Sequence, residues 1–330
     1  MEPTSSRRTL LRRAATGLAA AAAGRTILEG GLLPAQAAPK KGAAMQSGSG
    51  LPIVDTHQHL WDLTRFQLPW LSDVPKLRRS FVTKDYLEAT AGLNVVKTVY
   101  MEVDVAPNLQ VQEAEYVIDL CMRDDNPMAG AVISGRPAEA AFRDYIRRFR
   151  GSPYIKGVRQ VLHGPSTPRG FCHQAEFIRS MQFLGDLGMS YDLCMRGGEV
   201  GDAVKVLEAC PGTRFVLDHC GNPNVQEPAP HWKENISRVA ARPNVICKIS
   251  GIVASANPKS WKAADLAPFV NHCLAEFGPD RVIFGGDWPV CLLAASYKQW
   301  VHALKEIIAV RPEAEQRKLL AENAIRFYGI

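Results

Sequence analysis

Two histidines near the start of the chain are the side chains best suited to chemistry. His57 and His59 are separated by one residue in Val54-Asp-Thr-His-Gln-His-Leu-Trp-Asp62, behind an apolar lead-in. Successive side chains of a β-strand point to opposite faces, so imidazoles two positions apart share a face. They can then converge on one substrate or one metal ion. The pair therefore indicates an active site.

Two later segments supply partners for this pair. His219 follows Asp218 at the end of an apolar run, and Asp287 lies in Phe284-Gly-Gly-Asp-Trp-Pro-Val290. Three imidazoles and one carboxylate suit a single divalent ion, Zn²⁺ first of all, with a position left open for water. The carboxylate could equally be a general base in a metal-free site. Both alternatives stay open from the residues alone.

The pattern of apolar runs predicts the fold that would bring these residues together. Eight short β-branched runs alternate with segments that have helical periodicity, and no Gly-x-Gly-x-x-Gly follows the first run. This alternation of strand and helix patterns favours a closed (β/α)₈ TIM barrel, formed as a single domain by residues 51–330. Such a barrel gathers the carboxyl ends of its strands on one face. The expected strands are 53–60, 95–103, 128–134, 155–162, 189–195, 214–220, 245–250 and 281–288.

The N-terminal segment has the composition of a targeting signal. An arginine pair precedes Leu10 and Leu11, an Ala-rich apolar run follows, and Pro34-Ala-Gln-Ala-Ala38 supplies a cleavage pattern. We expect residues 1–37 to be a signal peptide of the twin-arginine type and residues 38–50 to be a flexible linker. The expected location is the periplasm. The apolar run, about ten residues long, is too short to span a bilayer.

Charge and cysteine content exclude other classes of protein. The formal net charge is +6, but five arginines and two glutamates in residues 1–37 account for +3, which leaves +3 for the remainder. This balance does not indicate a nucleic-acid-binding surface. The eight cysteines lack CxxC spacing and lie in apolar runs, so we interpret them as buried small hydrophobes, with one or two disulfides left open. A small-molecule ligand is the expected partner, and a homo-oligomer is compatible with this interpretation.

Several further residues are candidates for substrate contact. Arg159 lies in the fourth run and Arg136 follows the third, and either guanidinium could bind a carboxylate; an ion pair of Arg159 with Glu102 or Asp287 is the alternative. Aromatic rings can stack on a sugar, although a buried packing role is the default. A loop around residues 65–79 is expected to cover the barrel mouth. The remaining candidates are Trp61, Trp288, Glu102 and His163.

The chain resembles the amidohydrolase superfamily, in particular its amidohydrolase-2 branch of sugar-lactone and 2-pyrone-4,6-dicarboxylate lactonases. The resemblance extends from residue 53 to the C-terminus. The segments that carry it are Asp55-Thr-His-Gln-His-Leu-Trp-Asp62, Lys156-Gly-Val-Arg159, Leu217-Asp-His-Cys-Gly-Asn-Pro223, Asn244-Val-Ile-Cys-Lys-Ile-Ser-Gly251, Phe277-Gly-Pro-Asp-Arg-Val-Ile-Phe-Gly-Gly-Asp-Trp-Pro-Val290 and Asn323-Ala-Ile-Arg-Phe-Tyr328.

This resemblance implies hydrolysis of a lactone at a site formed by His57, His59, His219 and Asp287, with Asp287 taking a proton from the attacking water. It implies either one metal ion or none. The segment 192–195 supplies no histidine, and no lysine ends the fourth run, so a binuclear site is not expected. The alternatives are a Zn-dependent decarboxylase of the same superfamily and an exported protein that binds a carbohydrate acid without converting it.

Overall fold

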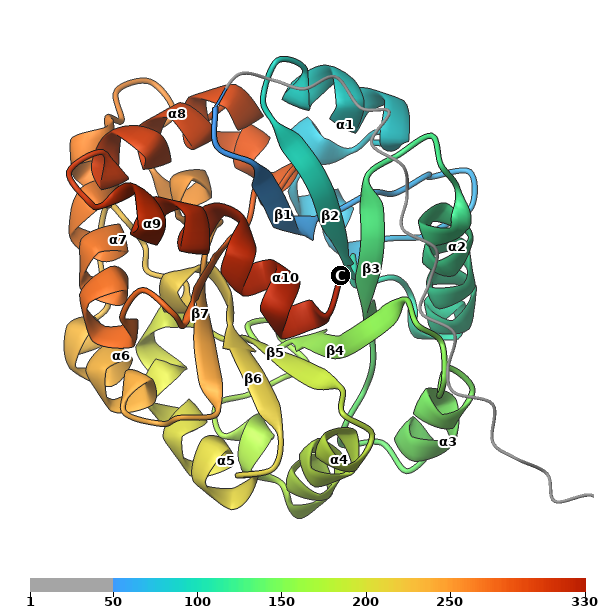
Figure 1. The fold of residues 1–330 in the computed structure, drawn as a ribbon. Coiled ribbons are helices and arrows are strands. Elements are labelled where there is room, and N and C mark those ends of the chain that lie inside the picture. Colours follow the sequence, from blue (N-terminus) through green and yellow to red (C-terminus); the bar gives the residue numbers. More distant parts are fainter. Residues whose placement is uncertain (1–49) are drawn as a thin grey trace, which may run out of the picture. The chain divides into compact units, whose positions relative to one another are not determined.

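Eight parallel strands form a barrel, as the sequence predicts (Figure 1). The computed structural model describes residues 50–330, so the expected signal peptide and all but the last residue of the expected linker lie outside the described residues. Neighbouring strands pair in sequence order, from the first to the eighth. The strands are β1 (Ile53–Gln58), β2 (Val95–Met101), β3 (Met128–Ser134), β4 (Ile155–Val161), β5 (Ser190–Cys194), β6 (Arg214–Leu217), β7 (Val245–Ile249) and β8 (Val282–Phe284).

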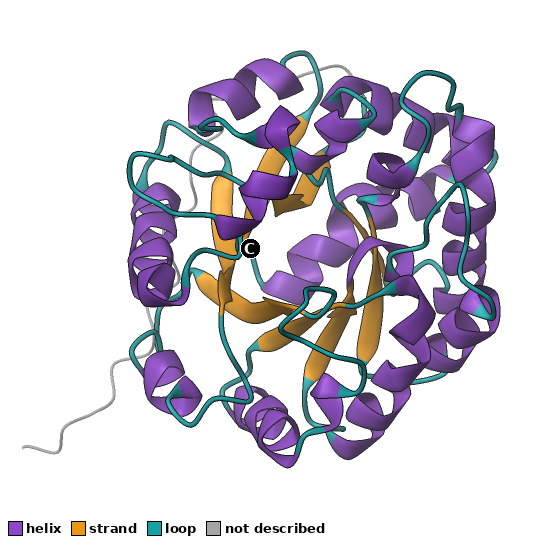
Figure 2. Cartoon of the chain, turned by 180° about the vertical axis from the view of Figure 1, so that it is seen from behind, coloured by secondary structure: helices purple, strands orange, loops and turns teal. Residues whose placement is uncertain are grey.

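Helices surround the strands on the outside of the barrel (Figure 2). None of those within residues 50–330 is long and apolar enough to cross a membrane. The helices are α1 (Thr83–Thr90), α2 (Gln110–Met122), α3 (Phe142–Arg147), α4 (Ala175–Asp186), α5 (Ala203–Ala209), α6 (Trp232–Ala240), α7 (Ala263–Phe277), α8 (Tyr297–Ile308), α9 (Glu313–Arg317) and α10 (Asn323–Tyr328), with a π-helical turn η9 (Lys318–Glu322) between the last two.

Closure between β1 and β8 occurs at their carboxyl ends. The amide of Asp287 donates to the carbonyl of His57 at 2.8 Å, and the amide of His59 donates to the carbonyl of Trp288 at 2.8 Å. Below them, the carboxylate of Asp55 accepts from the amides of His57 and Gly286. The seam of the barrel is therefore built from the same two segments that carry the candidate site residues.

Several strands are shorter than the apolar runs suggest. β6 ends at Leu217 and β8 at Phe284, so His219 and Asp287 lie beyond their strands rather than within them. Both residues adopt left-handed backbone conformations, with φ of 55° and 53°, and such conformations cannot continue a strand. The prediction is corrected on this point: tight turns after the strands, not the strands themselves, present these two side chains.

Apolar side chains fill two regions, one between the sheet and the helices and one inside the barrel. The inner cluster includes Val54, Val99, Val216 and Ile283, and the C-terminal segment closes it with Ala324 and Tyr328. Figure 1 shows α10 lying across this end of the barrel. All eight cysteines are buried, and none is paired in a disulfide.

Candidate active site

A pocket of about 670 Å³ opens at the carboxyl end of the barrel. His59, His219 and Asp287 line it, and Trp70 from the loop between β1 and β2 forms part of its wall, as predicted for that loop. His57 is completely buried and does not line the pocket. The barrel therefore brings three of the four candidate residues to one concave surface and places the fourth beneath it.

Asp287 is the centre of this group. Its Oδ1 lies 3.3 Å from Nε2 of His59 and 3.6 Å from Nε2 of His57. Ligand atoms of His57, His219 and Asp287 all lie within 4.8 Å of one another. The Asp287 side chain is only 4% exposed, so the carboxylate meets the pocket through a small opening.

Each imidazole turns its Nδ1 atom toward a group outside the pocket. For His59 the partner is the carbonyl of Met101 at 3.0 Å, and for His219 it is the hydroxyl of Ser250 at 2.8 Å. For His57 it is the carboxylate of Asp218 at 3.5 Å. A carbonyl oxygen only accepts, so Nδ1 of His59 carries a proton, and Nε2 is the ring atom that faces Asp287.

Burial keeps the inner histidines neutral. It lowers the pKa of His57 well below its ordinary value, helped by the positive charge that His219 would carry. Burial likewise lowers the pKa of His219, against the opposing effect of Asp287. Neutral imidazoles have a free nitrogen lone pair for a metal ion or a donated hydrogen bond.

Backbone geometry fixes where these side chains lie. Cys220, next to His219, also adopts a left-handed conformation, so the chain reverses sharply after β6. Gly251 packs directly against this turn, and a Cβ atom there would approach Nδ1 of His219 to 2.2 Å. Glycine is therefore required at position 251 for the ring to keep its place.

Charged side chains fill the barrel beneath the pocket. Lys248, on β7, places its Nζ 2.6 Å from the carboxylate of Asp192 and 3.0 Å from that of Asp218. Arg159 donates to Glu102 at 2.7 Å and to Asp218 at 3.3 Å. All five side chains are buried. We call this group, Glu102, Arg159, Asp192, Asp218 and Lys248, the charged layer.

The charged layer meets the active site through two contacts. Asp218 faces Nδ1 of His57, and Nη1 of Arg159 lies 3.2 Å from Nε2 of the same ring. Burial alone would raise the pKa of Asp218, but Lys248 and His57 hold it well below its usual range. Asp218 is therefore ionised, and an ionised carboxylate beside Nδ1 of His57 favours a proton on that nitrogen.

Three of the six predicted substrate contacts reach the pocket: Arg159, His163 and Trp61 all line it. Burial lowers the pKa of His163 to about 4, so this imidazole is neutral at physiological pH. The prediction left open whether Arg159 faces substrate or pairs with Glu102, and the structure contains both the ion pair and the pocket-facing position.

The other three predicted contacts are absent from the pocket wall. Trp288 packs edge-on against Phe81 and Tyr86 instead. Glu102 is completely buried and holds Arg159, and Arg136 pairs with Asp104 at 2.8 Å. We therefore do not assign substrate contact to Trp288, Glu102 or Arg136.

Sequence reasoning missed the charged layer as a unit. Lys248 stands in Val245-Ile-Cys-Lys-Ile249 and Asp192 in Ser190-Tyr-Asp-Leu-Cys194. Parallel strands buried on both faces are almost continuously apolar. A single charge inside such a run was the signal that could have identified both residues.

Comparisons with known proteins show which family the chain matches. The family model of amidohydrolases matches residues 54–330. L-fucono-1,5-lactonase of Burkholderia multivorans is 28% identical, over 84% of this chain and 96% of its own length. L-rhamnono-gamma-lactonase of Scheffersomyces stipitis is 24% identical, over 53% of this chain and 59% of its own.

A solved structure has the same architecture. An amidohydrolase from Burkholderia multivorans, crystallised with bound Zn, superposes with a TM-score of 0.76 at 26% identity, covering 84% of this chain and 99% of that one. The barrel, the histidines and the carboxylate at its mouth, and the family match over most of the chain lead to one assignment. The chain is a hydrolase that belongs to the amidohydrolase family.

Proposed function

We propose that this protein hydrolyses the cyclic ester of a sugar or polyhydroxy-acid lactone. The observation that carries the proposal is the carboxylate of Asp287 at the floor of a pocket, with His59 Nε2 3.3 Å away. The similarity to lactonases of Burkholderia multivorans and Scheffersomyces stipitis supports a lactone as the substrate class.

Asp287 is suited to act as the general base. A water molecule in the pocket beside its carboxylate can lose a proton to Oδ1 while its oxygen attacks the lactone carbonyl. The protonated carboxyl can then return the proton to the alkoxide that leaves when the ring opens. His59 and His57 border the same oxygen, so they orient the carboxylate toward the pocket.

Arg159 is suited to stabilise the charge that develops on the carbonyl oxygen. It reaches the pocket while Glu102 and Asp218 hold its guanidinium. A donor held in place before the reaction costs no reorganisation, and one well-placed donor contributes about 3 to 4 kcal/mol to transition-state stabilisation. Neutral His163, on the same wall, can bind a hydroxyl of the substrate.

The residues also fit one divalent metal ion, for which Zn²⁺ is our first candidate. His57, His59, His219 and Asp287 would hold it, because each histidine turns Nδ1 toward an outer partner. The Nε2 atoms of His57 and His59 face Asp287, and Nε2 of His57 also lies 3.2 Å from Nη1 of Arg159. This pattern of outer partners is typical of histidine ligands. When bound, such an ion would polarise the carbonyl and acidify water. Arg159 of the charged layer places a fixed cation beside the ring of His57.

A lactone panel tests the proposal directly. Purified protein would be assayed with five- and six-membered sugar lactones, with and without chelator, alongside elemental analysis. We expect saturable ring opening of at least one lactone, and loss of activity with loss of Zn if the ion is required. Turnover of none of the lactones, together with turnover of aromatic acids to carbon dioxide, would overturn the proposal in favour of a decarboxylase.

Replacement of Asp287 by Asn tests the role of the base. The variant keeps the size of the side chain but not its basicity, so we expect turnover to fall by about three orders of magnitude or more, with the fold unchanged. Asp144→Asn, an exposed position on α3, is the matched control. Near-normal hydrolysis by Asp287→Asn would refute the assignment.

A further inference from the structure

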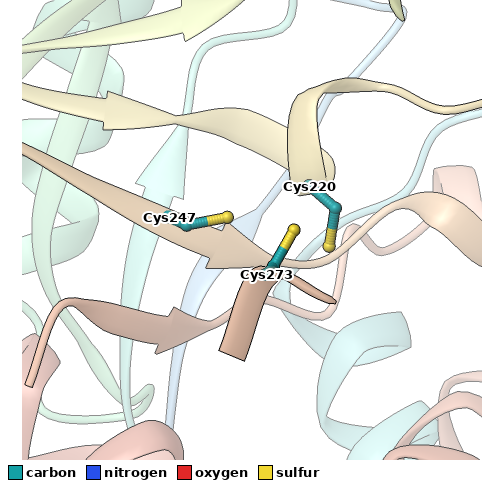
Figure 3. A group of neighbouring side chains, drawn as sticks. All are labelled: Cys220, Cys247 and Cys273. Atoms are coloured by element: carbon teal, nitrogen blue, oxygen red, sulfur yellow. The ribbon is translucent and has the colours of Figure 1, made fainter. Parts of the chain in front are cut away.

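Three cysteines from three different elements converge behind the barrel wall. Cys220 lies in the turn after β6, Cys247 on β7 and Cys273 on α7. Figure 3 shows their side chains directed toward one another. Their Sγ atoms lie within 4.8 Å of one another, and all three residues are completely buried. We call this group the cysteine triad.

We propose that the cysteine triad binds one soft d¹⁰ metal ion, with Zn²⁺ as the first candidate, at a structural site separate from the active site. Thiolates prefer such ions. Zinc–sulfur bonds are about 2.3 Å long, so sulfurs around one ion lie about 3.8 to 4.0 Å apart. Sulfur atoms already within 4.8 Å reach that spacing through small side-chain shifts.

The composition of the triad distinguishes it from the active site. It consists of sulfur ligands alone, whereas the two other ligand groups in residues 50–330 each contain His219 and an aspartate. The triad belongs to the apolar region between sheet and helices. Loading exchanges S–H protons for metal–sulfur bonds and releases those protons. A buried site of this kind would be loaded during folding.

The position of the triad would allow a bound ion to stabilise the turn after β6. Cys220 directly follows His219, and both residues have left-handed conformations. The carbonyl of Cys220 accepts from Nε1 of Trp232 on α6, and Trp232 packs against Phe269 on α7. An ion on the triad would join the turn that presents His219 to β7 and to α7. It would stabilise that turn without taking part in hydrolysis.

Cobalt substitution tests the triad without relying on activity. Protein produced in cobalt-supplemented minimal medium would be examined for thiolate-to-Co²⁺ charge-transfer absorption in the near ultraviolet. We expect this band in the wild type and its loss in both Cys273→Ala and Cys247→Ala. The metal content should fall by about one ion per chain in each variant. Lactone hydrolysis, measured in parallel, would be retained by Cys273→Ala.

Two controls identify the source of the band. Cys121→Ala removes a buried cysteine of α2 outside the triad, and Cys194→Ala removes the cysteine that lines the active-site pocket. Both variants should keep the band. A wild type without the band, or Cys273→Ala with wild-type metal content, would overturn the proposal. So would a denatured mass lighter by two hydrogens in the wild type but not in Cys273→Ala, because that result indicates a disulfide within the triad.

Discussion

The two ends of the barrel interior differ sharply, although the same strands build both. At the amino end of the strands, the interior is apolar: Val54, Val99, Val216 and Ile283 pack against the C-terminal helix. Toward the carboxyl end, the interior consists of the charged layer, with the pocket above it. Val216 lies on β6, for example, and Asp218 directly follows the end of this strand. Two residues along the chain therefore separate an apolar packing position from the charged layer.

This difference indicates how the fold tolerates buried charge. Taking an ion out of water costs several kcal/mol unless partners surround it. The carboxyl end meets this cost with alternating signs, because Lys248 lies between Asp192 and Asp218, and Arg159 lies between Asp218 and Glu102. The apolar end has no such cost and provides stability through burial. Variants in the two ends can therefore be compared for their effects on stability and on catalysis.

Lys248→Met should have the largest effect on stability. Removing the cation leaves Asp192 and Asp218 buried without it, and breaking a buried pair in this way costs about 3 to 5 kcal/mol. Urea unfolding of both proteins measures the loss. Lys156→Met is the control, because within residues 50–330 the ammonium group of this half-buried lysine of β4 forms no ion pair and donates to the carbonyl of Gly329. We expect the control to lose less than about 1 kcal/mol. Equal losses of unfolding free energy in the two variants would contradict a special role of Lys248 in balancing the buried carboxylates.

Glu113→Gln tests the edge of the charged layer through pH. Burial, reinforced by Glu102, raises the pKa of Glu113 from 4.5 to about 7. Between these values the folded protein holds more protons than the unfolded chain, so the free energy of unfolding falls as pH rises and levels off above about 7. Glutamine does not titrate. The variant should therefore gain about 3 kcal/mol relative to the wild type across this window.

Unfolding curves at a series of pH values measure this effect. Glu113 accepts hydrogen bonds from the amide of Val103 and the hydroxyl of Tyr100 through Oε1, and the amide oxygen of glutamine can accept both. Glu115→Gln changes an exposed position on the same helix, and its stability should follow the wild type at every pH. If the free energies of unfolding of Glu113→Gln and wild type differed by the same amount at every pH, the raised pKa assigned to Glu113 would be wrong.

Arg159→Lys asks whether the charged layer serves the reaction as well as the fold. Lysine keeps the charge but cannot hold Glu102 and Asp218 while also reaching the pocket. We expect kcat/KM for the best lactone to fall by about 10²-fold. Arg136→Lys alters an arginine that does not line the pocket, although its ion-pair partner Asp104 does, and it should change kcat/KM by less than about tenfold. Similar losses in both variants would remove Arg159 from its proposed role.

Most of the fold and the central part of the site could be predicted from the sequence. Apolar runs separated by helical segments are a strong signal of a parallel barrel, and the barrel places His57, His59, His219 and Asp287 together without further information. The position of Trp288 did not follow from the sequence, because β8 ends at Phe284, and beyond the end of a strand alternation no longer predicts where a side chain points.

Apart from the Arg159–Glu102 pair, which was one alternative from the sequence, the charged layer could not be assembled from the sequence, since its pairs depend on register between strands. Lys248 lies on β7 and Asp192 on β5, and only the barrel interior brings them within 2.6 Å. The cysteine triad could not be predicted for the same reason, because its three residues are spread over positions 220 to 273. Contacts made across a barrel have no local pattern in the chain.

Ile283→Val should have the smallest effect, and it tests the apolar end alone. Ile283 is completely buried on β8, four residues before Asp287, and belongs to the inner cluster. Losing one methylene group there should cost about 0.5 to 1.5 kcal/mol of stability. Because the methylene lies below the charged layer, kcat and KM should be unchanged, as steady-state kinetics on the best lactone would measure. A change in either kinetic constant would mean that strain at the apolar end reaches Asp287 along the strand, and the two ends would then not be independent.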